Sequence, residues 1–196
     1  MKRIGILGDI GSGKSFVAKC FGYPVFNADV EVGKIYKKDK NVFNKLKREL
    51  PTHFKSFPIK KTEVISAILS NKKNLKKIIK IIHYEVRKKM NIFLKKNKNK
   101  KIVILDIPLL LENKINKKDD VLIFVDSKKL DILKRLKKRK NFNPKLVKKF
   151  RDIQLPLDYK KKKSNYVLKN DFTSVTMKRN ISNILKKILK NESNNT

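Results

Sequence analysis

The residues best suited to chemistry stand near the start of the chain, in a run rich in glycine. Residues 8–15 read GDIGSGKS and fit the phosphate-binding pattern G-x-x-x-x-G-K-[ST] without a gap. Glycine lets successive backbone N–H groups turn toward phosphate oxygens, Lys14 would reach the β- and γ-phosphates, and the Ser15 hydroxyl would bind Mg²⁺. The residues that we expect to contact a nucleoside triphosphate are Asp9, Ile10, Gly11, Ser12, Gly13, Lys14, Ser15 and Phe16.

Two aspartates follow short apolar runs, at points where a strand would end. Asp29 comes soon after residues 24–26 (PVF), and Asp106 directly follows residues 102–105 (IVIL). In open α/β sheets, ligands bind at the carboxyl ends of the strands. Asp29 is therefore a candidate helix N-cap and a candidate catalytic carboxylate, and the two roles are compatible. Asp106 is either a capping or turn residue or a residue near Mg²⁺.

Among the basic residues, the few arginines are better indicators of a functional site than the many lysines. The net charge is +35, but lysine is spread along nearly the whole chain beside abundant asparagine and isoleucine, which indicates compositional drift. Only seven of the 52 basic residues are arginine, and Arg135 and Arg139 stand one helical turn apart. The planar arginine fork binds phosphate well, so these two are candidates for the site. The excess charge would attract polyanions non-specifically. The sequence shows no basic patch interleaved with aromatic residues, the feature that would indicate a specific nucleic-acid site.

Apolar runs and helical spacing predict the elements that must position these residues. Strands are expected at 3–7, 24–26, 102–105, 121–125 and 165–168, and helices at 15–21, 30–37, 128–140 and 173–189. Residues 39–99 have mostly helical spacing, and 141–163 has few large apolar residues, which favours a basic helical lid. Asp126 and Ser127 are expected to cap the helix that follows them.

Several classes of protein and site are disfavoured. The 196 residues suffice for one substantial core, and no apolar run approaches the 18 residues of a membrane span. Residues 4–7 are too short an apolar run for a signal peptide, so a cytoplasmic location is expected. Cys20 stands alone and is expected to be a small buried hydrophobe, and His83 has no partner at metal-ligand spacing, which favours a packed histidine.

Taken together, the motifs resemble the dephospho-CoA kinase family. Seven patterns of that family have counterparts in this chain. They are G-L-T-G-G-I-G-S-G-K-[ST] at residues 5–15, D-A-D at 27–29, H-P-x-[IV]-R at 83–87, D-x-P-L-L-F-E at 106–112, R-x-x-x-R at 135–139, R-x-x-Q at 151–154 and D-x-V-[IL]-x-N at 165–170. The matches occur in family order and cover nearly the full chain. Residues 5–15 match most of the first pattern. In the later patterns, Asn27 and Asn165 stand in place of aspartate, Tyr84 in place of proline, and Leu111 in place of phenylalanine.

The resemblance implies a three-layer α/β/α fold of the P-loop NTPase type, with a central parallel sheet of about five strands. It also implies a single domain over residues 1–196. Its core would span about 1–30, 101–140 and 164–190, with a helical acceptor-binding insertion at about 31–100. A small helical lid would span about 140–163, and residues 191–196 are expected to be a disordered tail.

The activity that the resemblance implies is phosphorylation of the ribose 3′-hydroxyl of dephospho-CoA by ATP with Mg²⁺. The products are coenzyme A and ADP, and the step is the last in coenzyme A biosynthesis. Asp29 would accept or orient the hydroxyl proton, and the other implied catalytic residues are Lys14, Arg87 and Arg139. The acceptor would be bound by Asp29, His83, Arg87, Asp106 and Leu109, and Mg²⁺ by Ser15 and, through water, by Asp106.

Two alternatives remain open from the sequence. One is another P-loop kinase that acts on a nucleoside or nucleotide, and the other is a basic nucleic-acid-binding ATPase. The segment 106–112 disfavours the first, and the scattered pattern of lysines disfavours the second. The oligomeric state is open, with a monomer favoured.

Overall fold

The computed structural model describes residues 1–140 and 142–193. Contacts divide the chain into two compact units. The core unit comprises Met1–Phe26, Asn97–Phe142 and Gln154–Thr196, and the helical unit comprises Asn27–Lys96 and Asn143–Ile153. The chain therefore passes between the units several times, and each unit is built from segments far apart in the sequence.

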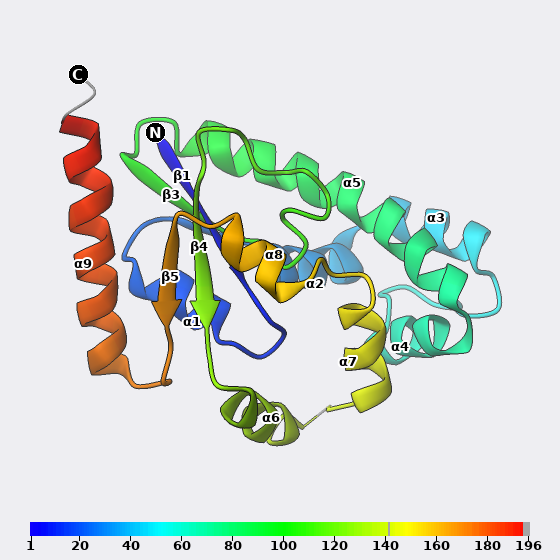
Figure 1. Ribbon diagram of the computed structural model, residues 1–196. Helices are drawn as coiled ribbons and strands as arrows, with labels where there is room; N and C mark the ends of the chain where they lie inside the picture. Colours follow the sequence, from blue (N-terminus) through cyan, green and yellow to red (C-terminus); the bar gives the residue numbers. More distant parts are fainter. Residues whose placement is uncertain (141, 194–196) are drawn as a thin grey trace. The chain divides into compact units, whose positions relative to one another are not determined.

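The core unit is organised around a five-stranded sheet in the order β2-β3-β1-β4-β5 (Figure 1). Its strands are β1 (Lys2–Gly8), β2 (Val25–Asn27), β3 (Ile102–Asp106), β4 (Val121–Asp126) and β5 (Tyr166–Lys169). Strand β1 pairs in parallel with both β3 and β4, and β4 pairs in parallel with β5. The central strands are continuous apolar runs because they are covered on both faces. This confirms the predicted fold class and all five strands.

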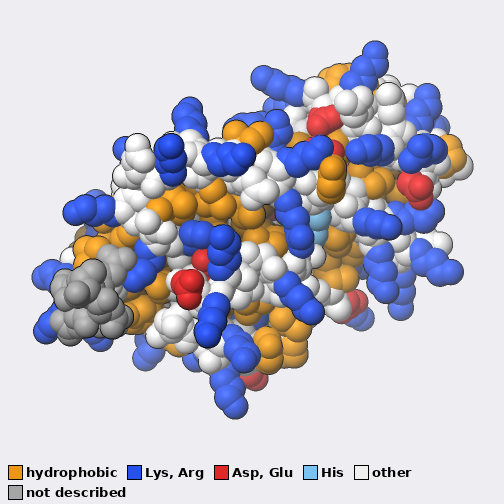
Figure 2. Space-filling model, turned by 90° about the horizontal axis from the view of Figure 1, so that it is seen from above, with side chains coloured by type: hydrophobic (Ala, Val, Ile, Leu, Met, Phe, Trp, Pro, Cys, Tyr) orange, Lys and Arg blue, Asp and Glu red, His pale blue; other side chains and the backbone are white. Residues whose placement is uncertain are grey.

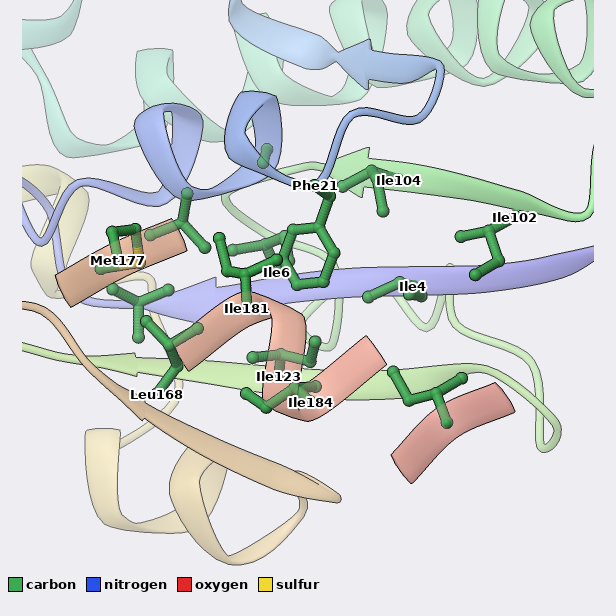
Figure 3. Packing of buried hydrophobic residues seen from close by; sticks show 14 residues of the cluster. Ile4, Ile6, Phe21, Ile102, Ile104, Ile123, Leu168, Met177, Ile181 and Ile184 are labelled. Atoms are coloured by element: carbon green, nitrogen blue, oxygen red, sulfur yellow. The ribbon is translucent and has the colours of Figure 1, made fainter. Parts of the chain in front are cut away.

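One face of the sheet is covered by α1 (Lys14–Cys20) and α9 (Ser174–Ser193). Figure 3 shows Ile4 and Ile6 of β1 in one cluster with Phe21, which follows α1, and Ile181 of α9. Both isoleucines are fully buried, and burying a side chain of this size stabilises the fold by about 1.5–3 kcal/mol. Cys20 packs against this cluster but is half-buried rather than buried as expected.

The opposite face of β1 is covered by residues 107–112 and by helix α8 (Leu157–Lys162). Gly5 lies on this face because successive side chains of a strand alternate. A β-carbon at Gly5 would lie 2.5 Å from Cδ2 of Leu110, so the turn after β3 can approach only a glycine. Helix α6 (Lys129–Lys137) also belongs to the core unit. With helices on both faces, the predicted three-layer arrangement is confirmed.

The helical unit is built on the long helix α5 (Lys72–Lys96). Its neighbours are α2 (Ala28–Lys38), α3 (Lys40–Glu49) and α4 (Lys61–Ser70), and α7 (Pro144–Arg151) packs on α4. Leu75, Ile78 and Ile82 form a buried stripe on α5, at the spacing that the sequence indicated. The Lys149 ammonium donates to the carbonyl of Ile68 at 2.8 Å, which fixes α7 to the end of α4.

Two segments differ from the boundaries expected from the sequence. Residues 140–163, expected as one lid, are divided: α7 belongs to the helical unit and α8 to the core unit. Helix α9 extends to Ser193, so it includes the first residues of the expected tail at 191–196, and 194–196 lie outside the described residues.

Lysine and arginine side chains are spread over the visible surface rather than gathered in one patch (Figure 2). In the part of the chain that the structure describes, no helix is both long enough and apolar enough to cross a membrane.

Candidate active site

The phosphate loop (residues 8–15) joins β1 to α1 at the carboxyl end of the sheet. Gly11 and Gly13 have φ values of 88° and 90°, the left-handed region that glycine adopts without strain. A β-carbon at Gly13 would lie 2.5 Å from Nδ2 of Asn170, so glycine is required there for space as well. The first turn of α1 has no acidic residue, and its positive end is therefore available to an anion.

Lys14 lies over the loop that precedes it. Its ammonium donates to the carbonyl oxygens of Asp9 at 2.7 Å and Gly8 at 3.2 Å. The Asp9 carboxylate accepts from the backbone N–H of Ile10 at 2.6 Å. Ser15 and Phe16 are exposed at the start of α1. The loop therefore presents an ammonium and a hydroxyl at one end of the sheet, as phosphate binding requires.

Asp106 and Leu109 lie next to the same end of the sheet. Asp106 is the last residue of β3, and the preceding Leu105 pairs with Gly5 of β1. The Asp106 side chain is buried, with 2% of the residue exposed. Leu109 is half-buried in the following turn, and its carbonyl accepts from Nδ2 of Asn113 at 2.8 Å. Asp106 is thus a buried carboxylate at a strand end beside β1, the strand that leads into the phosphate loop.

Two side chains from other strands hold the loop by the carbonyl of Ser12. Nδ2 of Asn170, which follows β5, donates to this oxygen at 2.8 Å, and Oγ of Ser127, which follows β4, donates at 3.0 Å. The expectation that Asp126 and Ser127 cap the next helix was wrong. The N-cap of α6 is Lys128 with no side-chain cap bond, whereas Asp126 accepts from the Lys161 ammonium at 2.8 Å and raises the pKa of Lys161.

Arg135 and Arg139 are in different structural settings. Arg135 lies in α6, and its guanidinium stacks 4.2 Å from the ring centre of Phe172. The same ring would lie 3.2 Å from a β-carbon at Gly13, so it borders the phosphate loop. Arg139 follows the end of α6 in a turn closed by its N–H on the carbonyl of Leu136. The expected shared helical face is therefore wrong, because α6 ends before Arg139.

Asp29, His83 and Arg87 belong to the helical unit. Asp29 is exposed in the first turn of α2, whose N-cap is Asn27: Oδ1 of Asn27 accepts from the N–H of Val30 at 2.8 Å. The capping interpretation of Asp29 is thus wrong, and the cap is the residue that departs from the family pattern. Half-buried His83 and exposed Arg87 lie one turn apart on α5, which packs on α2.

Tyr84, the second departure, is accommodated within an unbroken helix. Helix α5 runs through this position from Lys72 to Lys96, with Tyr84 exposed. The Lys88 ammonium lies 4.5 Å from the centre of its ring and that of Lys45 lies 5.5 Å from it. His83 and Arg87 are therefore displayed on regular helix rather than around a turn.

A buried ion pair connects the turn after β3 to α8. The Lys160 ammonium lies 2.6 Å from Oε1 of Glu112, with 1% and 9% of the two side chains exposed. Lys160 also donates to Oε1 of Gln154 at 3.1 Å, and Glu112 accepts from the N–H of Leu155 at 3.0 Å. Glu112 of the segment 106–112 and Gln154 of the segment 151–154 thus meet at one buried lysine.

A hollow of about 550 Å³ lies at the other end of the strands. Its lining includes Leu122 near the start of β4 and Asn165 just before β5. Oδ1 of Asn165 accepts from the N–H of Leu122 at 2.8 Å, a contact that the aspartate of the family pattern could also make. The phosphate loop follows the carboxyl end of β1, so this hollow is not part of the nucleotide site.

Comparison with known proteins shows the family of the chain. The family model described as dephospho-CoA kinase matches residues 2–176. The chain belongs to the dephospho-CoA kinase family. A dephospho-CoA kinase from Wolbachia sp. subsp. Brugia malayi (strain TRS) is 33% identical over 170 residues, which cover 84% of this chain and 87% of the relative. One from Bacillus thuringiensis subsp. konkukian (strain 97-27) is 32% identical over 193 residues, which cover 94% and 96%.

The fold is also that of a solved structure. The crystal structure of TT1252 from Thermus thermophilus superposes with a TM-score of 0.73 and 26% identity, and the superposition covers 97% of each chain. The family match and the fold thus agree on a kinase of the dephospho-CoA kinase family.

Sequence reasoning missed four residues around this site: Ser127, Asn170, Phe172 and Lys160. Asn170 closes a recognised pattern, and its fixed place there was the available signal, although no role follows from spacing alone. Ser127 was expected only as a helix cap, and Phe172 and Lys160 give no signal, because their contacts join segments far apart in the sequence.

Proposed function

We propose that this chain transfers the γ-phosphoryl group of ATP to the ribose 3′-hydroxyl of dephospho-CoA, which yields coenzyme A and ADP in the cytoplasm. The observation that carries the proposal is the family match over residues 2–176, together with an intact phosphate loop that bears Lys14. We propose that it acts as a monomer without a specific nucleic-acid partner. The scattered basic side chains support the latter point.

Residues 9–16 would hold the phosphates of ATP. The Lys14 ammonium, which lies on the carbonyls of Gly8 and Asp9, would exchange them for β- and γ-phosphate oxygens, a stronger charge-assisted contact. The Ser15 hydroxyl and the Asp106 carboxylate are oxygen donors, the kind that Mg²⁺ prefers, so these residues fit the metal, with Asp106 acting through water. When bound, Mg²⁺ neutralises charge on the β- and γ-phosphates.

The acceptor side would come from Asp29, His83, Arg87, Asp106 and Leu109. In the reaction, the 3′-oxygen forms a bond to the γ-phosphorus while the bond from that phosphorus to the β–γ bridging oxygen breaks. Asp29 would take or orient the hydroxyl proton, and it is suited to this because Asn27 already caps the helix. Arg87 and Arg139 would neutralise charge on the transferred group, and an arginine in this role is worth about 10³-fold or more in rate.

A panel of acceptors tests the proposal directly. Purified chain is incubated with Mg²⁺ and ATP labelled at the γ-phosphate, and with dephospho-CoA, nucleosides or nucleoside monophosphates. We expect label on dephospho-CoA alone, in a product that co-migrates with coenzyme A, and no transfer by Lys14→Met. Transfer to a nucleoside monophosphate but not to dephospho-CoA would overturn the proposal and favour the other kinase class.

A further inference from the structure

We propose that Asn170, assisted by Ser127, is a positioning residue that sets the direction of the phosphate-loop backbone for nucleotide binding. This inference rests on the proposed function only in that a nucleotide binds at residues 8–15. Asn170 stands 158 positions from Ser12 in the sequence, yet the two meet in a buried hydrogen bond within the core unit.

Two hydrogen bonds hold Asn170 in place apart from its contact with the loop. Its backbone N–H donates to the carbonyl of Asp126 at 2.8 Å, which continues the pairing of β5 with β4. Its Oδ1 accepts from the N–H of Phe172 at 2.9 Å. Its Nδ2 is then left to donate to the Ser12 carbonyl, and only 4% of the residue is exposed. The amide group therefore has a fixed orientation.

The Ser12 carbonyl receives two donors, which use both of its lone pairs. Nδ2 of Asn170 and Oγ of Ser127 approach it at 2.8 and 3.0 Å. Ser127 follows β4 and Asn170 follows β5, so two neighbouring strands hold the same atom. Within the described residues, Oγ of Ser12 itself has no hydrogen-bond partner, so the residue is anchored here by its backbone.

Holding the carbonyl oxygen of Ser12 in place also fixes the direction of a hydrogen-bond donor, the backbone N–H of Gly13. The carbonyl of Ser12 and the N–H of Gly13 belong to one planar trans peptide and point in opposite directions. With the oxygen turned toward Asn170 and Ser127, the Gly13 N–H is turned away from them. Backbone N–H groups of this kind are what a phosphate loop offers its ligand. Without the hydrogen bonds from Asn170 and Ser127, the Ser12–Gly13 peptide could rotate, and the Gly13 N–H would no longer have a fixed direction.

The close packing of Asn170 against Gly13 supports the positioning role of Asn170. A β-carbon there would lie 2.5 Å from Nδ2 of Asn170, so the asparagine amide lies directly against the backbone that it positions. Gly13 has φ of 90°, a conformation that needs an external constraint because glycine also has many others. Asn170 and Gly13 thus act as a matched pair.

Single substitutions of the two anchors test this role by nucleotide affinity. We expect Asn170→Ala to raise the dissociation constant for Mg·ATP, measured by calorimetry, by about tenfold, because one buried hydrogen bond is lost. Ser127→Ala should raise it by about threefold, since one donor remains. The dissociation constant for dephospho-CoA, measured without ATP, should stay within about twofold. Ser127→Thr keeps the hydroxyl and should restore the ATP affinity.

Asn165→Ala is the matched control. Asn165 stands just before β5, and its side chain accepts from Leu122 at the end of the strand pair away from the loop. This variant should lower the free energy of unfolding while ATP affinity is kept. If Asn170→Ala and Ser127→Ala bind ATP as the starting protein does, or if Asn165→Ala weakens ATP binding equally, the positioning role is refuted.

The design separates this inference from the proposed function. Failure of the starting protein to bind ATP would refute the proposed function, and this inference with it. Unchanged affinity in the variants would refute the inference alone. Should Asn170→Ala not fold, the pair Ser127→Ala and Ser127→Thr gives the same decision, because Ser127 is half-buried and its hydroxyl is the only group changed.

Discussion

At the scale of single residues, the start of α2 separates a structural role from a chemical one. Asn27 satisfies an N–H of the first turn, and Asp29 lies exposed two residues later. An amide and a carboxylate can both cap a helix, but only the carboxylate can accept a proton near neutral pH. The family departure at Asn27 therefore preserves the cap, and the proposed base is the neighbouring aspartate.

Asp29→Asn tests the chemical role. We expect kcat to fall by about 10²–10⁴-fold, the usual value of a positioned general base, with the dissociation constant for Mg·ATP nearly unchanged. Steady-state kinetics and calorimetry measure the two quantities. Unchanged kcat would leave Asp29 without a part in the reaction.

Asn27→Ala is the companion to that variant. Loss of the cap should lower the free energy of unfolding by about 1 kcal/mol, as judged by chemical denaturation. Turnover should stay within a few-fold of the starting protein, because the amide takes no part in the proposed chemistry. The opposite result, with loss of turnover and no loss of stability, would contradict the purely structural role of Asn27.

At the scale of elements, the buried side chain by which α8 packs on the core is a charged lysine, Lys160, rather than a stripe of apolar residues. Helix α8 contacts β1, and its Lys160 is buried against Glu112 and Gln154. Lys161, one position further along, is 46% exposed and pairs with Asp126. These two adjacent lysines each form an ion pair and differ strongly in burial, which makes them a useful comparison.

Lys160→Met should lower the free energy of unfolding by about 3–5 kcal/mol, because it leaves the Glu112 carboxylate buried without its partner. Lys161→Met should give no resolved change, since exposed pairs are screened by water and salt. The double variant Lys160→Met with Glu112→Met should recover part of the loss. Equal effects of the two single lysine variants, measured by denaturation, would contradict this account of α8.

At the scale of the whole molecule, the charge of +35 comes from lysines spread along the sequence, and they are scattered over the face drawn in Figure 2. A distributed charge attracts polyanions through released counterions and carries no sequence information. The same charge draws anionic nucleotides toward the protein at low salt. The excess lysine therefore affects encounter and background binding rather than the chemistry of the site.

Binding to a short DNA duplex, followed by fluorescence anisotropy, tests this view. We expect weak binding that is the same for unrelated sequences and falls by about 10³-fold or more between about 50 and 200 mM salt. Tight binding that survives the higher salt and distinguishes sequences would revive the nucleic-acid-binding alternative.

Local chemistry let the sequence determine much of this protein. The phosphate loop, the five strands, the stripe on α5 and the order of the family patterns all depend on residues close together in the chain. Asn165 and Asn27 could be recognised as departures from a pattern, but not as acceptors for Leu122 and Val30. The boundary of α6, which excludes Arg139, also lay beyond what spacing could predict.

Tertiary structure alone decided what meets across the sheet. The contact of Asn170 with Ser12 exists because β5 pairs with β4 and β4 pairs with β1. The sequence pattern around Asn170 or Ser12 does not indicate which residue each of them contacts. Burial of Lys160 likewise depends on the turn after β3, and its type alone predicts a solvated side chain. Short-range spacing specifies elements and motifs, whereas strand order brings distant polar groups together, and that order is a property of the assembled sheet.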